Sequence, residues 1–311
     1  MEKLLIITPH MSTGGCPQFV LKKIELLKDF YDIYCIEYNF LSPHFVVQRD
    51  KVIQILGDKF LSLYDNKSLI VDYIQNINPD ILFIEELSET FIDYEFCKFI
   101  YRGDRKYKIL ECTHGSENKS HIKRHLPDRF IFVSEWSKKT YEHFNVPIDV
   151  IEYPIDKKYK NLNFRKSLNF EEDYKHILNV GLFTPGKNQE YIFEIAKELI
   201  NGKIKFHFVG NQADNFKEYW QPLIENSTSN CVIWGEKDNV DEFLMSSDLF
   251  LFTSLFELNP LVIKESLCYD IPILMFNLET YCETYNNENN ITFLSGNITE
   301  DVKKIKNILG I

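Results

Sequence analysis

The chain has 311 residues, of which 44% are hydrophobic and 26% charged, an ordinary globular composition with room for two domains of about 150 residues. Its formal net charge of −11 argues against broad binding to nucleic acids or anionic membranes. No apolar stretch approaches the length of a membrane-spanning helix, and the seven cysteines include no C-x-x-C pair, so we expect a cytoplasmic protein with reduced thiols and at most peripheral membrane contact.

The first half of the chain alternates between strand-like and helix-like segments. The predicted strands cover residues 4–8, 33–38, 81–85, 107–112, 130–133 and 149–152. Helical periodicity covers residues 17–29 and 68–77. This alternation implies a parallel sheet with right-handed crossovers. Residues 157–173 are polar and without a pattern, which predicts an interdomain linker.

The second half restarts the same alternation. The predicted strands cover residues 176–180, 205–209, 231–234, 249–253, 271–276 and 291–294. The predicted helices cover residues 189–199, 216–225, 240–246, 260–268 and 299–309. The whole pattern predicts an α/β protein of two tandem Rossmann-like domains, with a ligand site in the cleft between them.

Two carboxylates, Glu257 and Glu265, bracket a strong predicted helix start. Asn259 is a good N-cap, and Pro260 suits the first helical position, where its missing N–H costs nothing. The buried strand over residues 249–253 comes just before. A strand, a short loop and a helix place the helix start at the carboxyl edge of a sheet, where nucleotides bind in open α/β folds.

The amides of this helix start are candidates for phosphate binding. The unpaired N–H groups of Leu261 and Val262 could cradle a phosphate. Glu257 and Glu265 could then accept hydrogen bonds from hydroxyls on either side of it, because carboxylates suit polyol recognition. Two surface carboxylates beside a capped helix are the alternative, and the spacing alone favours that alternative.

These residues and their surroundings, from Ser254 to Ile273, resemble the E-x7-E motif of the retaining family 4 glycosyltransferases (glycosyl transferases group 1). In that family the first Glu holds hydroxyls of the donor sugar and the second holds the nucleotide ribose. The resemblance implies the GT-B fold, with two parallel sheets facing a central cleft. It implies an acceptor-binding domain over residues 1–160 and a nucleotide-sugar-binding domain over residues 161–311, whose last helix can pack back on the first.

The turn that begins at Gly181 resembles the family segment in which an Arg and a Lys neutralise the donor diphosphate. Lys187 stands at the Lys position, but the Arg position is Leu182, a departure from the family pattern. Losing one cation would weaken compensation of the leaving-group charge. A solvated turn lysine is the alternative for Lys187.

Further candidates rest on the same resemblance. Gly14 and Gly15 match the glycine pair that lets the backbone approach the donor phosphates, although glycines in such loops often serve only the turn. His114 matches a His near the reacting sugar, where a neutral imidazole could donate a hydrogen bond. Asn211 and Glu236 stand in loops that line the nucleotide side, where polar residues are often only solvated.

A basic stretch after His114 stands out in this acidic chain. We hypothesise that Lys119, Lys123 or Arg124 faces the cleft and replaces the missing Arg or holds an anionic acceptor. A solvated helix face is the alternative. The usual Asn-Gly pair at the end of the first domain is Tyr153-Pro154 here, a second departure from the family pattern.

The resemblance implies a retaining hexosyltransferase that moves a sugar from a nucleoside-diphosphate-sugar, a UDP-sugar in preference to a GDP-sugar, to a glycan, glycolipid or glycoprotein. The chain contains no D-x-D pair, so no metal and no cofactor beyond the donor are expected. A degenerate GT-B protein that binds nucleotide-sugar or glycan without transfer is one alternative. A phage-type enzyme that glycosylates DNA bases is another, and the net charge counts against it.

Overall fold

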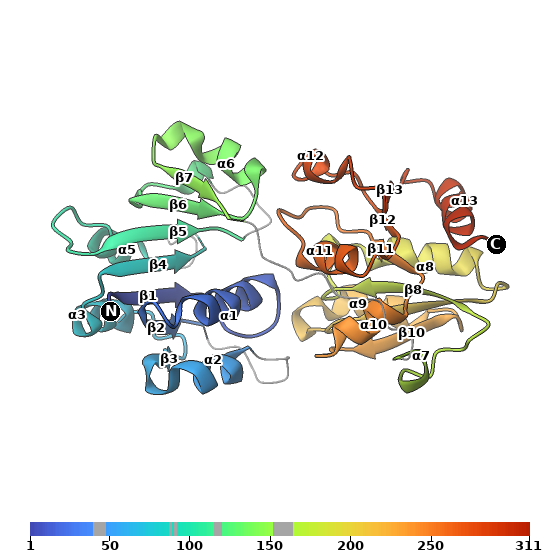
Figure 1. Cartoon of the computed structure of the whole chain (residues 1–311), viewed down its shortest axis with the longest axis horizontal. Coiled ribbons are helices and arrows are strands. Elements are labelled where there is room, and N and C mark those ends of the chain that lie inside the picture. Colours follow the sequence, from blue (N-terminus) through green and yellow to red (C-terminus); the bar gives the residue numbers. More distant parts are fainter. Residues whose placement is uncertain (40–47, 87–88, 90–91, 115–119, 152–163) are drawn as a thin grey trace. The chain divides into compact units, whose positions relative to one another are not determined.

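The computed structural model describes residues 1–39, 48–86, 89, 92–114, 120–151 and 164–311. The chain divides into two compact units, residues 1–153 and 154–311. Figure 1 colours the first unit from blue to green and the second from green-yellow to red. The predicted domain boundary at residue 160 lies outside the described residues.

The first unit is a parallel sheet with helices around it (Figure 1). Its strands are β1 (Lys3–Thr8), β2 (Asp32–Glu37), β3 (Phe60–Ser62), β4 (Ile81–Glu85), β5 (Lys108–Cys112), β6 (Arg129–Phe132) and β7 (Ile148–Val150). Its helices are α1 (Gly15–Leu27), α2 (Arg49–Leu56), α3 (Leu69–Ile77), α5 (Tyr94–Ile100) and α6 (Glu135–Tyr141). The strand order is β3-β2-β1-β4-β5-β6-β7, and every described pairing is parallel.

The second unit repeats this plan (Figure 1). Its strands are β8 (Lys175–Val180), β9 (Ile204–Val209), β10 (Cys231–Gly235), β11 (Leu249–Phe252), β12 (Ile273–Met275) and β13 (Ile291–Phe293). Its helices are α7 (Phe164–Ser167), α8 (Gln189–Glu198), α9 (Lys217–Glu225), α10 (Val240–Ser246), α11 (Leu261–Cys268), α12 (Cys282–Tyr285) and α13 (Ile298–Leu309). The strand order is β10-β9-β8-β11-β12-β13.

Strand β11 of the second sheet buries apolar side chains on both of its faces. Along β11, Leu249 and Leu251 belong to one core cluster, while Phe250 and Phe252 belong to another. Near-continuous apolar runs are typical of parallel strands buried on both sides. This apolar run predicted the strand from sequence.

The last helix, α13, packs on its own unit. Val302, Ile305 and Leu309 lie in the core cluster that α8 also enters, and Asn297 caps the helix by accepting a hydrogen bond from the N–H of Glu300. The apolar face of α13 is therefore used within the second unit, and packing of the last helix on the first domain stays a prediction.

Part of the predicted linker belongs to the second unit. Residues 164–167 form α7, and Leu168 and Phe170 are buried in the core beside β8 and α10. The linker prediction is therefore wrong for residues 164–173. Two buried apolar side chains, Leu168 and Phe170, hold this polar segment against the second unit. Residues 157–163 lie outside the described part of the chain.

Candidate functional site

Each sheet has one point where the strand order reverses, and the candidate residues follow the strands at or near that point. In the second unit, β8 and β11 are neighbours although two strands separate them in sequence. Open α/β folds bind ligands outside the carboxyl ends of strands at such a switch point. Lys187 follows β8 and Glu257 follows β11, so the topology brings these two predicted residues to the same place.

The loop after β8 is held by hydroxyl groups. Thr184 caps the short 3₁₀ turn Pro185–Lys187, and its hydroxyl accepts a hydrogen bond from the N–H of Lys187 at 3.3 Å. Thr253, just past the end of β11, donates to the carbonyl oxygens of Lys187 and Asn188 at 3.0 and 2.9 Å. The backbone of Lys187 is therefore fixed by the neighbouring strand.

The side chains of Lys187 and Glu257 form an ion pair across this switch point. The side chain of Lys187 is 32% exposed and that of Glu257 is 18% exposed. The hydroxyl of Thr280 donates to the carbonyl oxygen of Glu257, which ties the loop after β11 to the loop after β12. The Lys187 ammonium has three donors, so it can keep Glu257 and also bind an anion.

Two glycines let the loops after β8 and β9 approach closely. A Cβ atom added to Gly210 would lie 1.9 Å from the carbonyl oxygen of Gly181, which no side chain could tolerate. At Gly181 itself an added Cβ would lie 3.6 Å from Cδ of Lys187, so the lysine side chain runs over this glycine. Leu182, at the predicted Arg position, is half-buried and adds no charge.

Asn211 and Glu236 meet at the ends of β9 and β10. The side-chain amide of Asn211 donates to a carboxylate oxygen of Glu236 at 2.8 Å. Beneath them, the N–H of Gly210 donates to the carbonyl oxygen of Gly235 at 2.8 Å. These two predicted residues are thus one hydrogen-bonded pair at the same edge of the sheet as Lys187.

The start of α11 differs from its prediction by one residue. Pro260 is the N-cap, with ψ at 111°, and the helix begins at Leu261. The prediction of Asn259 as N-cap and Pro260 as first helical residue is therefore wrong. Leu261 and Val262 are the first helical residues and are half-buried, as is Glu265 one turn later.

In the first unit the strand order reverses between β1 and β4. Gly14 and Gly15 follow β1, and Gly14 adopts a φ of 109° before α1 begins without a side-chain cap. His114 follows β5, and its ring packs edge-on against Phe19 of α1, with 5.0 Å between ring centroids. The three predicted residues of this unit therefore lie at one sheet edge, just past the carboxyl ends of β1 and β5.

A buried carboxylate that the sequence-based predictions omit holds His114. Glu85, the last residue of β4, has a fully buried side chain, and one of its oxygens lies 2.8 Å from Nε2 of His114. Its other oxygen is ion-paired with Lys23 of α1. The signal available in the sequence was an acidic residue at the end of a predicted buried strand, at the edge where sites form.

The neighbouring residue Glu86 fixes the backbone of the same loop. Its carboxylate accepts hydrogen bonds from the N–H of His114 at 3.1 Å and from the hydroxyl of Thr113 at 3.3 Å. Glu86 adopts a φ of 72°, a left-handed conformation that is uncommon outside glycine. At the end of β4, Glu86 therefore holds the backbone of His114 and Glu85 holds its ring.

The pKa values of this cluster follow from burial and pairing. Burial disfavours the charged form of Glu85, but Lys23 and His114 lower its pKa to about 2. Burial likewise works against a charged His114, but the carboxylate of Glu85 beside Nε2 raises its pKa above the ordinary value. Burial raises the pKa of the Cys16 and Cys112 thiols, so Glu85 supplies the full negative charge that contacts the ring at neutral pH.

Glu85, Cys112 and His114 also place three possible metal-ligand atoms within 4.8 Å of one another. The Glu85 oxygens are already used by Lys23 and His114, and a lysine ammonium repels a divalent cation from the same carboxylate. We therefore interpret the group as a hydrogen-bonded network.

The hypothesis that Lys123 faces a cleft is wrong. Its side chain is fully buried and forms ion pairs with Glu111 at 2.8 Å and Glu89 at 3.0 Å. The Tyr101 hydroxyl donates to Glu111 at 2.6 Å. The alternative of a solvated helix face fails for Lys123 too, whereas Arg124 is exposed. Lys119, Tyr153 and Pro154 lie outside the described residues.

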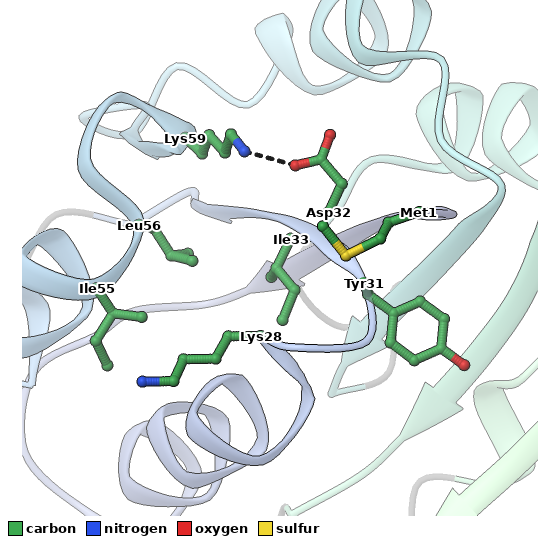
Figure 2. Close-up of a pocket in the computed structure, with 8 residues that line it drawn as sticks. All are labelled: Met1, Lys28, Tyr31, Asp32, Ile33, Ile55, Leu56 and Lys59. Atoms are coloured by element: carbon green, nitrogen blue, oxygen red, sulfur yellow. Dashed lines mark hydrogen bonds and ion pairs between the residues drawn. The ribbon is translucent and has the colours of Figure 1, made fainter.

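One pocket lies at the opposite edge of the first sheet, at the amino end of β2 (Figure 2). Lys59 and Asp32 form a half-exposed ion pair of 2.6 Å at its rim, and Lys28 points along its other side (Figure 2). Because it faces away from the carboxyl edge, we assign it no part in the candidate site. Among the helices of the described residues, none is both long and apolar enough to cross a membrane.

Residues 160–310 match the family model described as "Glycosyl transferases group 1". The chain is 25% identical over 275 residues to the uncharacterized glycosyltransferase MJ1059 of Methanocaldococcus jannaschii, covering 84% of this chain and 62% of that protein. It is 30% identical over 120 residues to the capsular polysaccharide biosynthesis glycosyltransferase CapH of Staphylococcus aureus, covering 37% and 34%. The chain thus spans less than two thirds of the length of either relative.

The fold has a close counterpart among solved structures. The crystal structure of Anabaena Alr3699/HepE in complex with UDP and glucose superposes with a TM-score of 0.80 over 99% of this chain and 90% of that chain, at 12% identity. At this identity the likeness shows the fold alone, the GT-B fold with its two parallel-sheet α/β units. Residues 160–310 are thus similar to a glycosyl transferases group 1 domain, within a chain that has the GT-B fold.

Proposed function

We propose that the chain is a retaining, metal-independent glycosyltransferase. It would move a sugar from a nucleoside-diphosphate-sugar, a UDP-sugar rather than a GDP-sugar, to a hydroxyl of a glycan, lipid-linked or protein-linked acceptor. The observation that carries the proposal is the Lys187–Glu257 pair at the switch point of the second unit. The capsular polysaccharide role in the name of CapH and the UDP and glucose bound to HepE support this substrate class.

Lys187 and Glu257 divide the work at the reacting centre. The bond between the sugar C1 and the diphosphate oxygen breaks, and its electron pair goes to that oxygen. Lys187 would stabilise the developing negative charge, while Glu257 would accept hydrogen bonds from sugar hydroxyls. The acceptor oxygen bonds to C1 on the same face, and its proton goes to the leaving phosphate. No protein nucleophile is needed.

The remaining predicted residues would hold the donor away from the bond that breaks. Glu265 would accept hydrogen bonds from the ribose hydroxyls, and the amides of Leu261 and Val262 would bind a phosphate. The Asn211–Glu236 pair would face the nucleotide. Gly14, Gly15 and His114 would serve the donor from the first unit.

Leu182 favours a second candidate, a protein that binds a nucleotide-sugar without transferring it. The side chain at the position of the missing Arg is apolar and half-buried, so Lys187 alone would neutralise the diphosphate in this loop. Donor turnover, including slow hydrolysis without acceptor, separates the two candidates, because the binding protein would show none.

The test is a thermal-shift screen without metal against UDP, GDP, ADP, CMP and their sugar conjugates. We expect selective stabilisation by UDP and its conjugates, lost in Glu265→Ala. Glu225→Ala, which removes an exposed carboxylate at the end of α9, is the matched control and should keep the stabilisation. A shift by none of these compounds would overturn the proposal.

A further inference from the structure

We propose that Glu85 is a positioning residue that fixes the ring of His114 and keeps it protonated, with Lys23 as the counter-ion that keeps Glu85 ionised. The inference rests on the proposed function, in which His114 faces the donor. It changes the role expected from sequence, because a protonated ring presents a positive charge and donates from both nitrogens. His114 could then not act as a base toward the acceptor.

Both carboxylate oxygens of Glu85 contact a basic side chain. Its side chain is fully buried, and its two oxygens face different cations, Lys23 on α1 and His114 after β5. Lys23 is itself held, with its ammonium 3.2 Å from the ring centroid of Phe83 and 4.8 Å from that of Phe19. Phe19 also packs on the ring of His114. The three charged groups are therefore locked by packing as well as by hydrogen bonds.

The charges that face His114 come from three elements. Helix α1 supplies Lys23 and the thiol of Cys16, the end of β4 supplies Glu85 and Glu86, and β5 supplies the thiol of Cys112. With the thiols neutral and Glu86 bonded to the backbone N–H of His114, the ring sees one contacting carboxylate. A neutral imidazole could still donate its Nε2–H to Glu85, but an opposite charge at hydrogen-bond distance stabilises the protonated ring.

Lys23 makes the arrangement testable, because the two partners of His114 act in opposite directions. Removing the negative charge of Glu85 leaves Lys23 and His114 to repel each other, which lowers the pKa of His114. Removing the positive charge of Lys23 leaves Glu85 to His114 alone, which raises it. A fold that had merely loosened would not move the pKa in opposite directions.

The experiment is an NMR titration of the full chain with labelled histidine, with the His114 resonance assigned through His114→Gln. We expect the pKa of His114 to lie above 6.5, to fall by roughly 1–3 in Glu85→Gln and to rise in Lys23→Met. Glu37→Gln is the matched control, because Glu37 is a buried carboxylate that ends β2 and pairs with Arg49. It should leave the His114 titration unchanged.

Kinetics then separate this inference from the proposed function. In an active transferase, the loss of turnover at high pH should move to lower pH in Glu85→Gln by the same amount as the pKa, and Glu85→Asp should restore part of it. A His114 that titrates near 6.5, or that ignores Glu85→Gln, overturns the inference while transfer activity stands. Opposite pKa shifts without any donor turnover support the pairing and overturn the proposed function instead.

Discussion

Glu85 ends β4 with a fully buried side chain, whereas Glu257, after β11, keeps 18% of its side chain exposed. Both lie at the switch point of their own sheet, and both are paired with a lysine. The other oxygen of Glu85 contacts His114, so both oxygens of this carboxylate are paired within the protein. Lys187, the partner of Glu257, is 32% exposed and keeps donors for a ligand.

This difference separates two uses of one topological position. The buried cluster of the first unit sets the state of a side chain, while the half-exposed pair of the second unit offers charge to an incoming molecule. Changes in buried pairs should therefore cost stability first. Changes in the second-unit pair should cost turnover or affinity and leave stability nearly unchanged.

The largest stability effect is expected from Lys123→Met in the first unit. The substitution leaves Glu111 and Glu89 without their cation inside the protein, which costs about 3–5 kcal/mol for a buried pair. Urea unfolding of the full chain measures the loss. Arg129→Met, which breaks an exposed pair with Asp149, is the control and should cost about 0–1 kcal/mol. Equal losses would erase the distinction between buried and exposed pairs.

Lys187→Met should lower turnover by about 10²–10³-fold, the usual cost of removing one group that stabilises developing negative charge. Its melting temperature should stay near that of the unchanged chain. Both side chains of the pair reach solvent, so water can solvate the Glu257 carboxylate when Lys187 is removed. Lys203→Met, which breaks an exposed pair with Asp173 at the other edge of the same sheet, is the control for turnover. If Lys187→Met keeps its activity within a few-fold of that of the unchanged chain, Lys187 does not stabilise the leaving diphosphate.

Glu265→Ala should weaken UDP binding by about 1–3 kcal/mol, because a ribose hydroxyl pair would lose its acceptor. Glu257→Ala should lower turnover more than it lowers nucleotide affinity, because its expected partner is the sugar. Isothermal titration with UDP, beside initial rates, measures both quantities. The assignment of the two carboxylates is wrong if both variants bind UDP and turn over as the unchanged chain does.

The sequence predicted most of the elements that bury apolar side chains, but it missed β3 and α5. The α10 helix was predicted with its observed bounds, and every predicted strand was found within two residues at each end. Apolar runs between turn residues carry that signal. It was weak for α2, where Val52 and the paired Arg49 are the buried residues. It was also weak for α6, which buries only Ser137 and Tyr141.

Contacts between residues far apart in sequence could not be predicted in the same way. Lys123 reads as a surface charge until Glu89 and Glu111 meet it from other elements. The roles of Glu85 and Lys23 likewise depend on α1, β4 and β5 coming together. In the second unit the candidate pair was foreseeable, because each partner belongs to a local pattern. Their direct ion pair required the strand order, which no local pattern encodes.

The smallest predicted effect concerns acid stability and again separates the units. In the second unit, the indole N–H of Trp234 donates to Nδ1 of His207 at 3.0 Å, and Nε2 of His207 lies 2.9 Å from Nδ1 of His176. Phe170 stacks on both rings. With Nδ1 of His207 occupied as an acceptor, the chain of hydrogen bonds is complete only when this ring is neutral.

Burial, His176 and Lys205 lower the pKa of His207 to about 3. Because the unfolded chain binds a proton near pH 6.5 and the folded chain does not, this stabilisation is complete above pH 6.5. It is lost as the pH falls toward 3, at about 1.4 kcal/mol per pH unit. His114 has a raised pKa, so its contribution is complete below pH 6.5 and is lost only as the pH rises.

Urea unfolding at pH 7 and pH 5 should therefore show a larger loss of stability at acid pH in the unchanged chain than in His207→Gln. The glutamine amide offers an acceptor and a donor for the same two hydrogen bonds but cannot titrate. The same acid loss in both would mean that the carboxylates, and not this histidine, set the response.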